Sequence, residues 1–142
     1  MAFSDNPLFA QLVDAAMLDQ PAAEQILREH PELINATNRL GEAALHFLAV
    51  ENYADGVAFL ARHGAPIDAR DASGRTPLMD AAMVGATQVV RQLLACGADP
   101  RLRTPDDETV WDLLDSECVT ELLSIFHEHG FVPPPGAPDI SF

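Results

Sequence analysis

His127, Glu128 and His129 form the segment of this chain that comes nearest to a catalytic or metal-binding motif. Imidazole and carboxylate groups are common zinc ligands, and a helix presents two histidines to one ion when they are spaced i, i+4. The two histidines here are spaced i, i+2, so on a helix they point in different directions. We therefore predict no metal site in this segment.

Other reactive side chains occur in patterns that favour structural roles. Asp106, Asp107 and Glu108 are adjacent, but they lack the regular ligand spacing and the distant bidentate glutamate of a calcium loop. Cys96 and Cys118 have no basic neighbour and no Cys-x-x-Cys pairing, so we expect reduced thiols rather than a nucleophile. The sequence contains no glycine-rich phosphate loop and no Gly-x-Ser-x-Gly turn. We predict no catalytic residue, no metal and no cofactor, and hence a protein that is not an enzyme.

Composition limits the partners of such a protein. A net charge of −14 on 142 residues should repel nucleic acid and anionic membranes and favour a basic partner. No apolar run approaches the roughly 20 residues of a membrane helix, and no secretory signal is recognisable. We expect a cytoplasmic protein that is a monomer when free. All 8 basic residues are arginine, which indicates a GC-rich, bacterial genome.

The elements that must position these side chains repeat with a period of 33 residues. Leu45 recurs as Leu78, and Leu60 recurs as Leu93. The same interval relates further positions: Gly41 and Gly74, Ala49 and Ala82, Val57 and Val90, and the series Gly64, Gly97 and Gly130. A fixed period in this range predicts a stack of small units, which builds an extended surface for another macromolecule.

The third unit, residues 71–103, has the clearest local pattern. Thr76 is suited to cap a helix, and Pro77 suits its first turn because the missing N–H would have no partner there. Gly85 should end this helix, and Gly97 should end a second helix in a left-handed conformation. The apolar face of the second helix is expected to contain Val89, Val90, Leu93 and Leu94.

The period divides the chain into four units, at about 5–37, 38–70, 71–103 and 104–132. The first unit is less regular: helices are expected to begin at Pro7 and Pro21, and Pro31 stands in the place of the closing glycine. In the fourth unit, the bulky Trp111 and Phe126 suit an end that must cover the stack.

A proline-rich tail follows the last unit. Residues 133–142 contain 4 prolines and are predicted to be extended or disordered. An extended tail could alternatively dock through Ile140 and Phe142, either on this protein or on a partner.

At this level of detail the units resemble the ankyrin repeat. The family pattern runs Gly-x-Thr-Pro-Leu-His, then Ala-Ala, a glycine, a Val-Val/Leu-Leu helix and Gly-Ala-Asp. The third unit matches it at Gly74, Thr76-Pro77-Leu78, Ala81-Ala82, Gly85 and Gly97-Ala98-Asp99, and the second at Leu45-His46, Gly64-Ala65 and Ile67-Asp68. The resemblance implies an all-α solenoid of four helix-turn-helix repeats with projecting hairpin loops, within residues 1–132.

The departures from that pattern lie in the turns. Met79 stands where histidine is usual, and Ala43-Ala44 replace Thr-Pro. Each hydrogen bond lost in this way should cost on the order of 1 kcal/mol, whereas His46 is expected to brace its turn. Asn52 and Asp107 stand at glycine positions, which leaves the local geometry open.

The resemblance also implies a function. Ankyrin repeats bind other proteins through the tips of their hairpins and the concave face of their first helices. Carried onto this chain, the predicted partner-binding residues are Arg39, Leu40, Glu42, Val50, Glu51, Arg70, Arg75, Met83, Val84, Arg103 and Glu108.

Two patterns in the sequence itself favour this surface. Most of the arginines lie on or beside the hairpins, namely Arg39, Arg70, Arg75, Arg101 and Arg103. An apolar stripe recurs at the ends of the first helices, at Met17-Leu18, Val50 and Met83-Val84. Arginine beside exposed apolar side chains is typical of interface centres. Alternatively, the arginines offset nearby carboxylates such as Asp71, Asp99 and Asp106, and the stripe packs into the next repeat.

We predict a non-enzymatic module that binds another protein through its hairpin tips and concave groove. A dedicated inhibitor or immunity protein, which neutralises a basic toxin or enzyme, is the main alternative. An enzyme with an unrecognised site in the groove and a structural protein that assembles with itself are the remaining classes.

Overall fold

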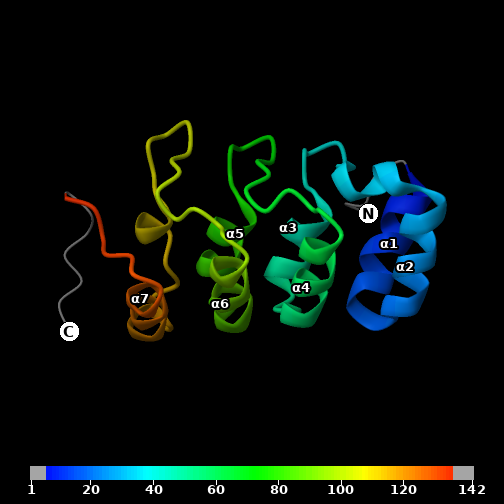
Figure 1. Ribbon diagram of the computed structural model, residues 1–142. Helices are drawn as coiled ribbons and strands as arrows, with labels where there is room; N and C mark the ends of the chain where they lie inside the picture. Colours follow the sequence, from blue (N-terminus) through cyan, green and yellow to red (C-terminus); the bar gives the residue numbers. More distant parts are fainter. Residues whose placement is uncertain (1–5, 136–142) are drawn as a thin grey trace.

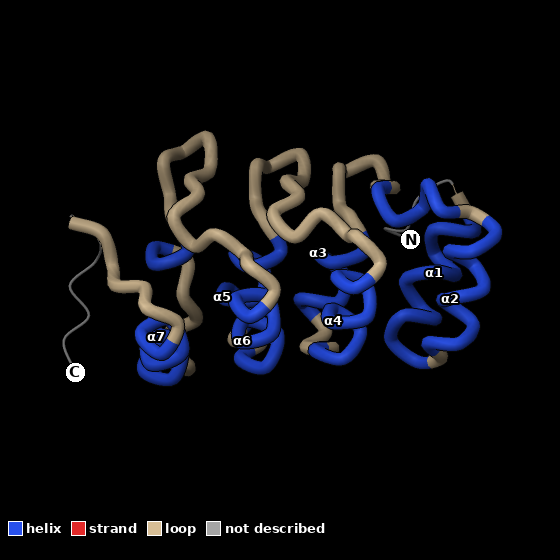
Figure 2. The backbone as a smooth tube through the Cα atoms, in the orientation of Figure 1, coloured by secondary structure: helices blue, strands red, loops and turns tan. Residues whose placement is uncertain are grey.

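The computed structural model describes residues 6–135, in which helices and loops make up the chain apart from one isolated bridge between Thr37 and Ala43. The helices stand side by side in a row, and loops project from one edge of it (Figures 1 and 2). The α-helices are α1 (Pro7–Leu18), α2 (Gln20–Glu29), α3 (Ala44–Val50), α4 (Ala54–Arg62), α5 (Pro77–Val84), α6 (Thr87–Ala95) and α7 (Val119–Glu128). The short 3-10 helices in this part of the chain are η1 (Pro31–Asn35) and η2 (Val110–Asp112). The predicted all-α solenoid is confirmed.

The core is continuous along the row because each repeat covers its neighbour. The first helices pack on one another, α1 on α3 and α3 on α5, and the second helices form a parallel layer of α4, α6 and α7. Residues at equivalent positions fill the space between them: Leu45 and Leu78 are 1% exposed, and Leu60 and Leu93 are fully buried. The 33-residue period of the sequence is therefore the period of the packing.

The predicted turns of the third repeat are present. The Thr76 hydroxyl accepts a hydrogen bond of 3.3 Å from the Met79 N–H, with Pro77 in the first turn of α5. Gly85 ends α5 with a φ of +72°, and Gly97 follows α6 with a φ of +94°. Both conformations are left-handed, where a Cβ atom would be strained.

The two replaced glycines keep the glycine conformation. Asn52 has a φ of +59° and Asp107 a φ of +65°. The side-chain oxygen of Asn52 accepts a hydrogen bond of 3.2 Å from the N–H of Val89, in the next repeat. Asparagine and aspartate tolerate this region better than other residues with a Cβ, so the substitutions leave the repeat geometry intact.

The fourth repeat departs from the expected helix-turn-helix plan, because a single 3-10 turn, η2, stands where its first α-helix was expected. Here side chains compete with the backbone for hydrogen bonds. The Asp112 carboxylate accepts from the Thr109 N–H at 2.8 Å, and the Asp115 carboxylate accepts from the N–H groups of Glu117 and Cys118, each at 3.1 Å. Such bonds stabilise turns at the expense of helix.

The first repeat also corrects a sequence expectation. Pro31 stands at the closing-glycine position, directly after the C-cap His30 of α2, but it begins the 3-10 helix η1 and has no left-handed conformation. Likewise α2 begins at Gln20, with the Asp19 carboxylate capping it at 3.2 Å and Pro21 one residue inside. Of the predicted tail, residues 133–135 are loop, and the rest, with Ile140 and Phe142, lies outside the described residues.

Candidate protein-binding surface

Within the described residues, hairpins at 38–42, 71–75 and 104–108 project from the edge of the stack as the first, second and third fingers, and a side chain at the same repeat position closes each one. Asn38 Oδ1 accepts hydrogen bonds from the N–H groups two and four residues along, at 2.9 and 3.0 Å. Asp71 Oδ1 does the same at 2.9 and 3.0 Å, and the Thr104 hydroxyl accepts from the Glu108 N–H at 3.2 Å. The three fingers therefore share one shape that their own sequences specify.

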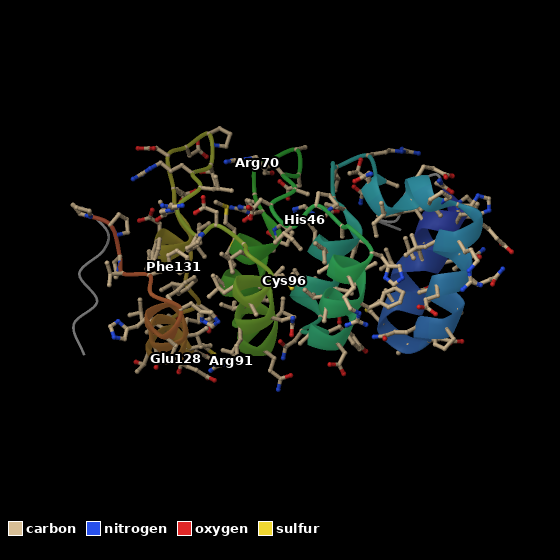
Figure 3. The ribbon with its side chains drawn as sticks, in the orientation of Figure 1. His46, Arg70, Arg91, Cys96, Glu128 and Phe131 are labelled. Atoms are coloured by element: carbon tan, nitrogen blue, oxygen red, sulfur yellow. The ribbon has the colours of Figure 1, made fainter. Side chains whose placement is uncertain are left out.

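Arg70 and Arg103 occupy equivalent positions and brace the fingers. Nη1 of Arg70 donates to the carbonyls of Gly74 at 3.1 Å and Arg103 at 2.6 Å, which joins two successive fingers (Figure 3). Nη1 of Arg103 donates to the carbonyl and carboxylate of Asp107, at 3.2 and 3.3 Å. Arg70 and Arg103, which were predicted to contact a partner, thus form hydrogen bonds within the protein.

Backbone contacts fix the distance between fingers as well. The Ala72 N–H donates a hydrogen bond of 2.8 Å to the Leu40 carbonyl of the preceding finger. A Cβ atom on Gly41 would lie 2.9 Å from the Ala72 nitrogen, and one on Gly74 would lie 2.4 Å from Cδ of Pro105. Glycine at these positions allows the close approach, so neighbouring fingers keep a fixed spacing.

The remaining finger residues predicted to bind a partner differ in exposure. Arg39 and Leu40 are exposed, Leu40 at 57%, whereas Glu42, Arg75 and Glu108 are half-buried. The Glu42 carboxylate accepts a hydrogen bond of 2.9 Å from the Asn38 amide, within its own finger.

The loop arginine Arg101 pairs with Asp99. Nε of Arg101 lies 3.0 Å from Oδ1 of Asp99, and hydrogen bonds from its side chain and N–H lower the pKa of that carboxyl. This contact, with the one between Arg103 and Asp107, supports the reading in which arginines offset carboxylates. At Arg70 the acceptors are backbone carbonyls instead.

Apolar side chains are exposed at the ends of the first helices. Leu18 is 76% exposed, Val50 43% and Val84 52%, beside the exposed carboxylate of Glu51. Met17 and Met83 are half-buried. The alternative in which this stripe packs into the next repeat therefore applies at most to the two methionines, and the other side chains are available to a partner.

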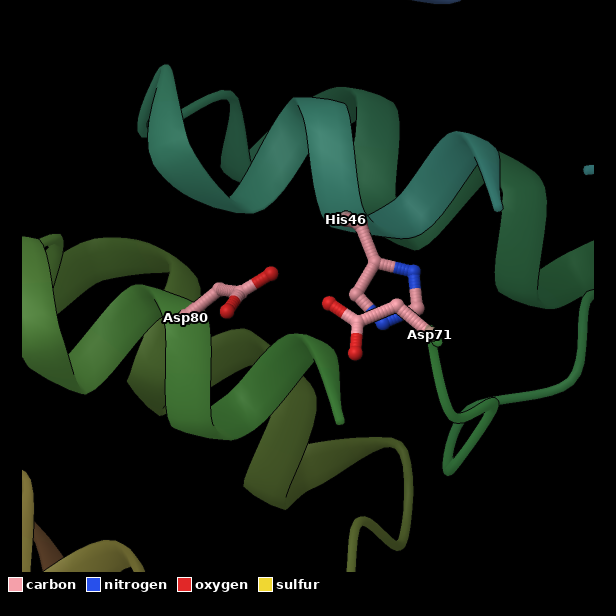
Figure 4. A group of neighbouring side chains, drawn as sticks. All are labelled: His46, Asp71 and Asp80. Atoms are coloured by element: carbon pink, nitrogen blue, oxygen red, sulfur yellow. The ribbon is translucent and has the colours of Figure 1, made fainter. Parts of the chain in front are cut away.

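His46, Asp71 and Asp80 meet where the second finger joins the helices (Figure 4). Their potential ligand atoms lie within 4.8 Å of one another. Burial raises the pKa of Asp80 to about 6. The structure gives the Asp80 carboxylate no hydrogen-bond donor among the described residues.

Coordination of a metal by this cluster conflicts with the bonding of His46. Its Nδ1 accepts from the Ala43 N–H at 3.0 Å, which leaves Nε2 to donate to the Arg75 carbonyl at 2.9 Å. A metal needs a free nitrogen lone pair. Binding would break a buried hydrogen bond, so we assign His46 a structural role as the brace of its turn.

The reactive groups considered from sequence are also engaged. Glu128 of α7 forms an ion pair with Arg91 of α6 (Figure 3). Nδ1 of His129 lies 2.9 Å from the carbonyl oxygen of Ile125. Desolvation and the Asp115 carboxylate raise the pKa of Cys118, which keeps the thiol protonated and weakly nucleophilic.

Sequence reasoning missed the setting of Asp80 and the bracing role of Arg70. Asp80 lies on the first helix, where Asp14 occupies the equivalent place in the first repeat and Phe47 that in the second. A carboxylate among apolar neighbours was a usable signal for Asp80. No local pattern reports a bond from Arg70 to a carbonyl 33 residues away.

Comparison with known proteins agrees with this geometry. A family profile described as "Ankyrin repeats (3 copies)" matches residues 12–104. The chain is 29% identical over 124 residues to human protein phosphatase 1 regulatory subunit 27, covering 87% of this chain and 79% of that protein. It is 33% identical over 109 residues to mouse ankyrin repeat and SAM domain-containing protein 6, covering 72% of this chain and 12% of that protein.

A similar match joins this chain to human BCL-6 corepressor-like protein 1, at 30% identity over 98 residues, which is 69% of this chain and 6% of that protein. The profile covers three of the four units that the 33-residue period marks out. The hairpin closures and the left-handed turns recur at the positions that the repeat requires. The chain therefore belongs to the ankyrin-repeat family.

Proposed function

We propose that this protein is a non-enzymatic module that binds another protein through its finger tips and the exposed ends of its first helices. The observation that carries the proposal is the exposure of Leu40 on a finger and of Val50 and Val84 at the ends of α3 and α5, in a stack whose fingers are fixed internally. Exposed apolar side chains on a rigid support are what an interface uses, since little conformational entropy is lost on binding. Family membership supports a binding role over catalysis.

The named relatives support the same class of role. One relative is, by its name, a regulatory subunit of a protein phosphatase, and this chain covers most of its length. A second is named as a corepressor-like protein. We infer a regulatory or scaffolding interaction for this chain too, with the partner left to experiment.

The proposed centre of the surface is Val50, Met83 and Val84, flanked by Arg39, Arg70, Arg75 and Arg103. Arg75→Glu combined with Met83→Glu should abolish partner binding and leave the helical circular dichroism unchanged. Affinity capture from the native extract, followed by mass spectrometry, measures this. The matched control is Arg62→Glu with Gln88→Glu, which changes the charge equally at exposed positions of α4 and α6. Equal recovery with the double variant and the wild type contradicts the location.

A dedicated inhibitor or immunity protein is the second candidate, and the net charge of −14 favours it. Such a charge accelerates encounter with a basic toxin or enzyme and makes the binding sensitive to salt. An inhibitor should bind one basic enzyme tightly and stoichiometrically, whereas an adaptor should bind several proteins with micromolar affinity. Titration calorimetry at low and high salt on the captured partner separates the two.

We place this interaction in the cytoplasm, without nucleic acid or membrane. The free thiols of Cys96 and Cys118 fit a reducing compartment. Among the described residues, no helix has the length and apolarity that crossing a bilayer requires. We also propose that the free protein is a monomer; light scattering that increases with concentration contradicts this.

A further inference from the structure

Charge is divided between the two parts of the proposed surface. Within the described residues, every arginine lies in a hairpin, a loop or a second helix. The first helices, η2 and the turns that follow them have carboxylates and no arginine: Asp14, Asp19, Glu51, Asp80, Asp112, Asp115 and Glu117. A partner that approaches the helices therefore meets a negative field, while the finger arginines Arg70 and Arg103 are occupied within the protein.

A row of exposed side chains runs along this acidic part. Leu18, Glu51, Val84 and Glu117 occupy the same repeat position, 33 residues apart, and all are exposed. The row alternates apolar and acidic side chains from one repeat to the next. Val50 lies beside it at 43% exposure. We name these residues, together with Asp80, the first-helix face.

Asp80 adds a carboxylate whose lost solvation is not fully replaced by contacts within the free protein. It is half-buried on α5, and the groups that face it are the imidazole of His46 on α3 and the charged side chains of Asp71, Arg75 and Glu42 in the fingers. Loss of solvent is the largest influence on this group. A cationic side chain from a partner, placed within reach of Asp80, would replace the lost solvation.

We propose that the first-helix face binds a basic, amphipathic segment of a partner protein, whose apolar side chains cover Leu18, Val50 and Val84 and whose arginines or lysines lie beside the carboxylates. The inference rests on the proposed binding function and specifies the chemistry of the partner. Charge complementarity identifies the occupant, because a neutral or acidic segment would leave Glu51, Asp80 and Glu117 beside it without counter-charges.

A random peptide library displayed on phage tests the proposal, with selection on the wild-type protein alone, and Glu51→Lys/Glu117→Lys is the charge variant against which the selected peptides are compared. The matched control is Glu24→Lys/Glu121→Lys, which makes the same charge change at exposed positions of α2 and α7. Val50→Ser/Val84→Ser removes the apolar part without altering charge. Synthetic copies of the selected peptides are then titrated against each variant by calorimetry.

The expected peptides contain more arginine and lysine than aspartate and glutamate, together with aliphatic or aromatic side chains. Their Kd should rise about tenfold in the charge variant and about tenfold in the apolar variant, and stay unchanged in the control. Neutral or acidic peptides, or equal weakening by the control, overturn the inference. If neutral or acidic peptides are selected and still bind Arg75→Glu/Met83→Glu more weakly, the proposed function stands and only the inference about a basic partner is contradicted. If no selected peptide loses affinity in any surface variant, the inference and the proposed function are both contradicted.

Discussion

Nε2 of His46 donates a hydrogen bond of 2.9 Å to the backbone carbonyl of Arg75, in the following repeat. The same ring accepts from the Ala43 N–H at 3.0 Å and is 1% exposed. One side chain thus closes the turn at the start of α3 and fastens the second finger to that helix. The third repeat has Met79 at the equivalent place and relies on its threonine cap instead.

His46→Ala should lower the free energy of unfolding by about 3 kcal/mol, because it leaves a cavity and two unpaired backbone groups. Urea denaturation followed by circular dichroism measures the change. His127→Ala, at an exposed position of α7, serves as the control and should stay within about 0.5 kcal/mol of the wild type. A cost below about 1 kcal/mol for His46→Ala would show that the brace is dispensable.

Asp80→Asn should stabilise the protein at neutral pH and not in acid. Burial raises the pKa of Asp80 from its ordinary 3.8 to about 6 in the folded state. The folded state therefore holds the proton more tightly, and the stability contributed by this group, present below the unfolded pKa, is lost as the pH rises through about 6. After solvent screening the gain in the variant is on the order of 1–2 kcal/mol.

Urea titrations of both proteins at about pH 4 and about pH 7.5 measure this gain. The difference between the two proteins isolates Asp80, since the other carboxylates titrate in both. A difference that does not change between the two pH values would contradict the assignment.

Gly74→Ala should cost about 2–4 kcal/mol, since its φ is +79° and the new Cβ would lie 2.4 Å from Cδ of Pro105. Gly97→Ala is the matched comparison. Its φ is +94° but nothing lies within 4 Å of the added atom, so it should cost only about 1 kcal/mol. Melting temperatures by calorimetry test the pair, and equal losses would mean that contact between fingers contributes nothing.

Asp107→Gly should stabilise the protein by about 0.5 kcal/mol, since it relieves a left-handed aspartate and loses only an exposed contact to Arg103. Asn52→Gly should bring no such gain, because it removes the acceptor of the Val89 N–H. Thermal unfolding under identical conditions compares them. A larger gain for Asn52→Gly would mean that its hydrogen bond to the next repeat is worth little.

The fold could be predicted from the sequence because each repeat is specified locally. Thr76, Pro77 and Gly85 define the ends of α5 within ten neighbouring positions, and the same rules apply one period away. The fourth repeat could not be predicted so well. The carboxylates of Asp112 and Asp115 can be solvated or can accept from a backbone N–H. Which of the two occurs depends on contacts with α5, such as the hydrogen bond of 2.9 Å from the Asp115 N–H to the Ala82 carbonyl.

The candidate surface was predictable in position but not in charge. The exposed Leu18 and Val84 share one repeat position at the end of a first helix, and Val50 lies one residue before that position. The internal bonds of the arginines could not be predicted in this way. Arg70 has acceptors in its own finger and in the next one, and such bonds depend on the spacing of the folded repeats. Asp80 likewise acquires its raised pKa only when the second and third repeats meet.

Arg70 and Arg103 mark equivalent joints, one on each side of the third repeat. A coding segment for residues 71–103 could be duplicated in tandem at such a joint, and the new copy would meet neighbours of the kind it already has. Lineages of this protein could thus lengthen by whole repeats, each adding one more finger, without redesigning either end of the stack.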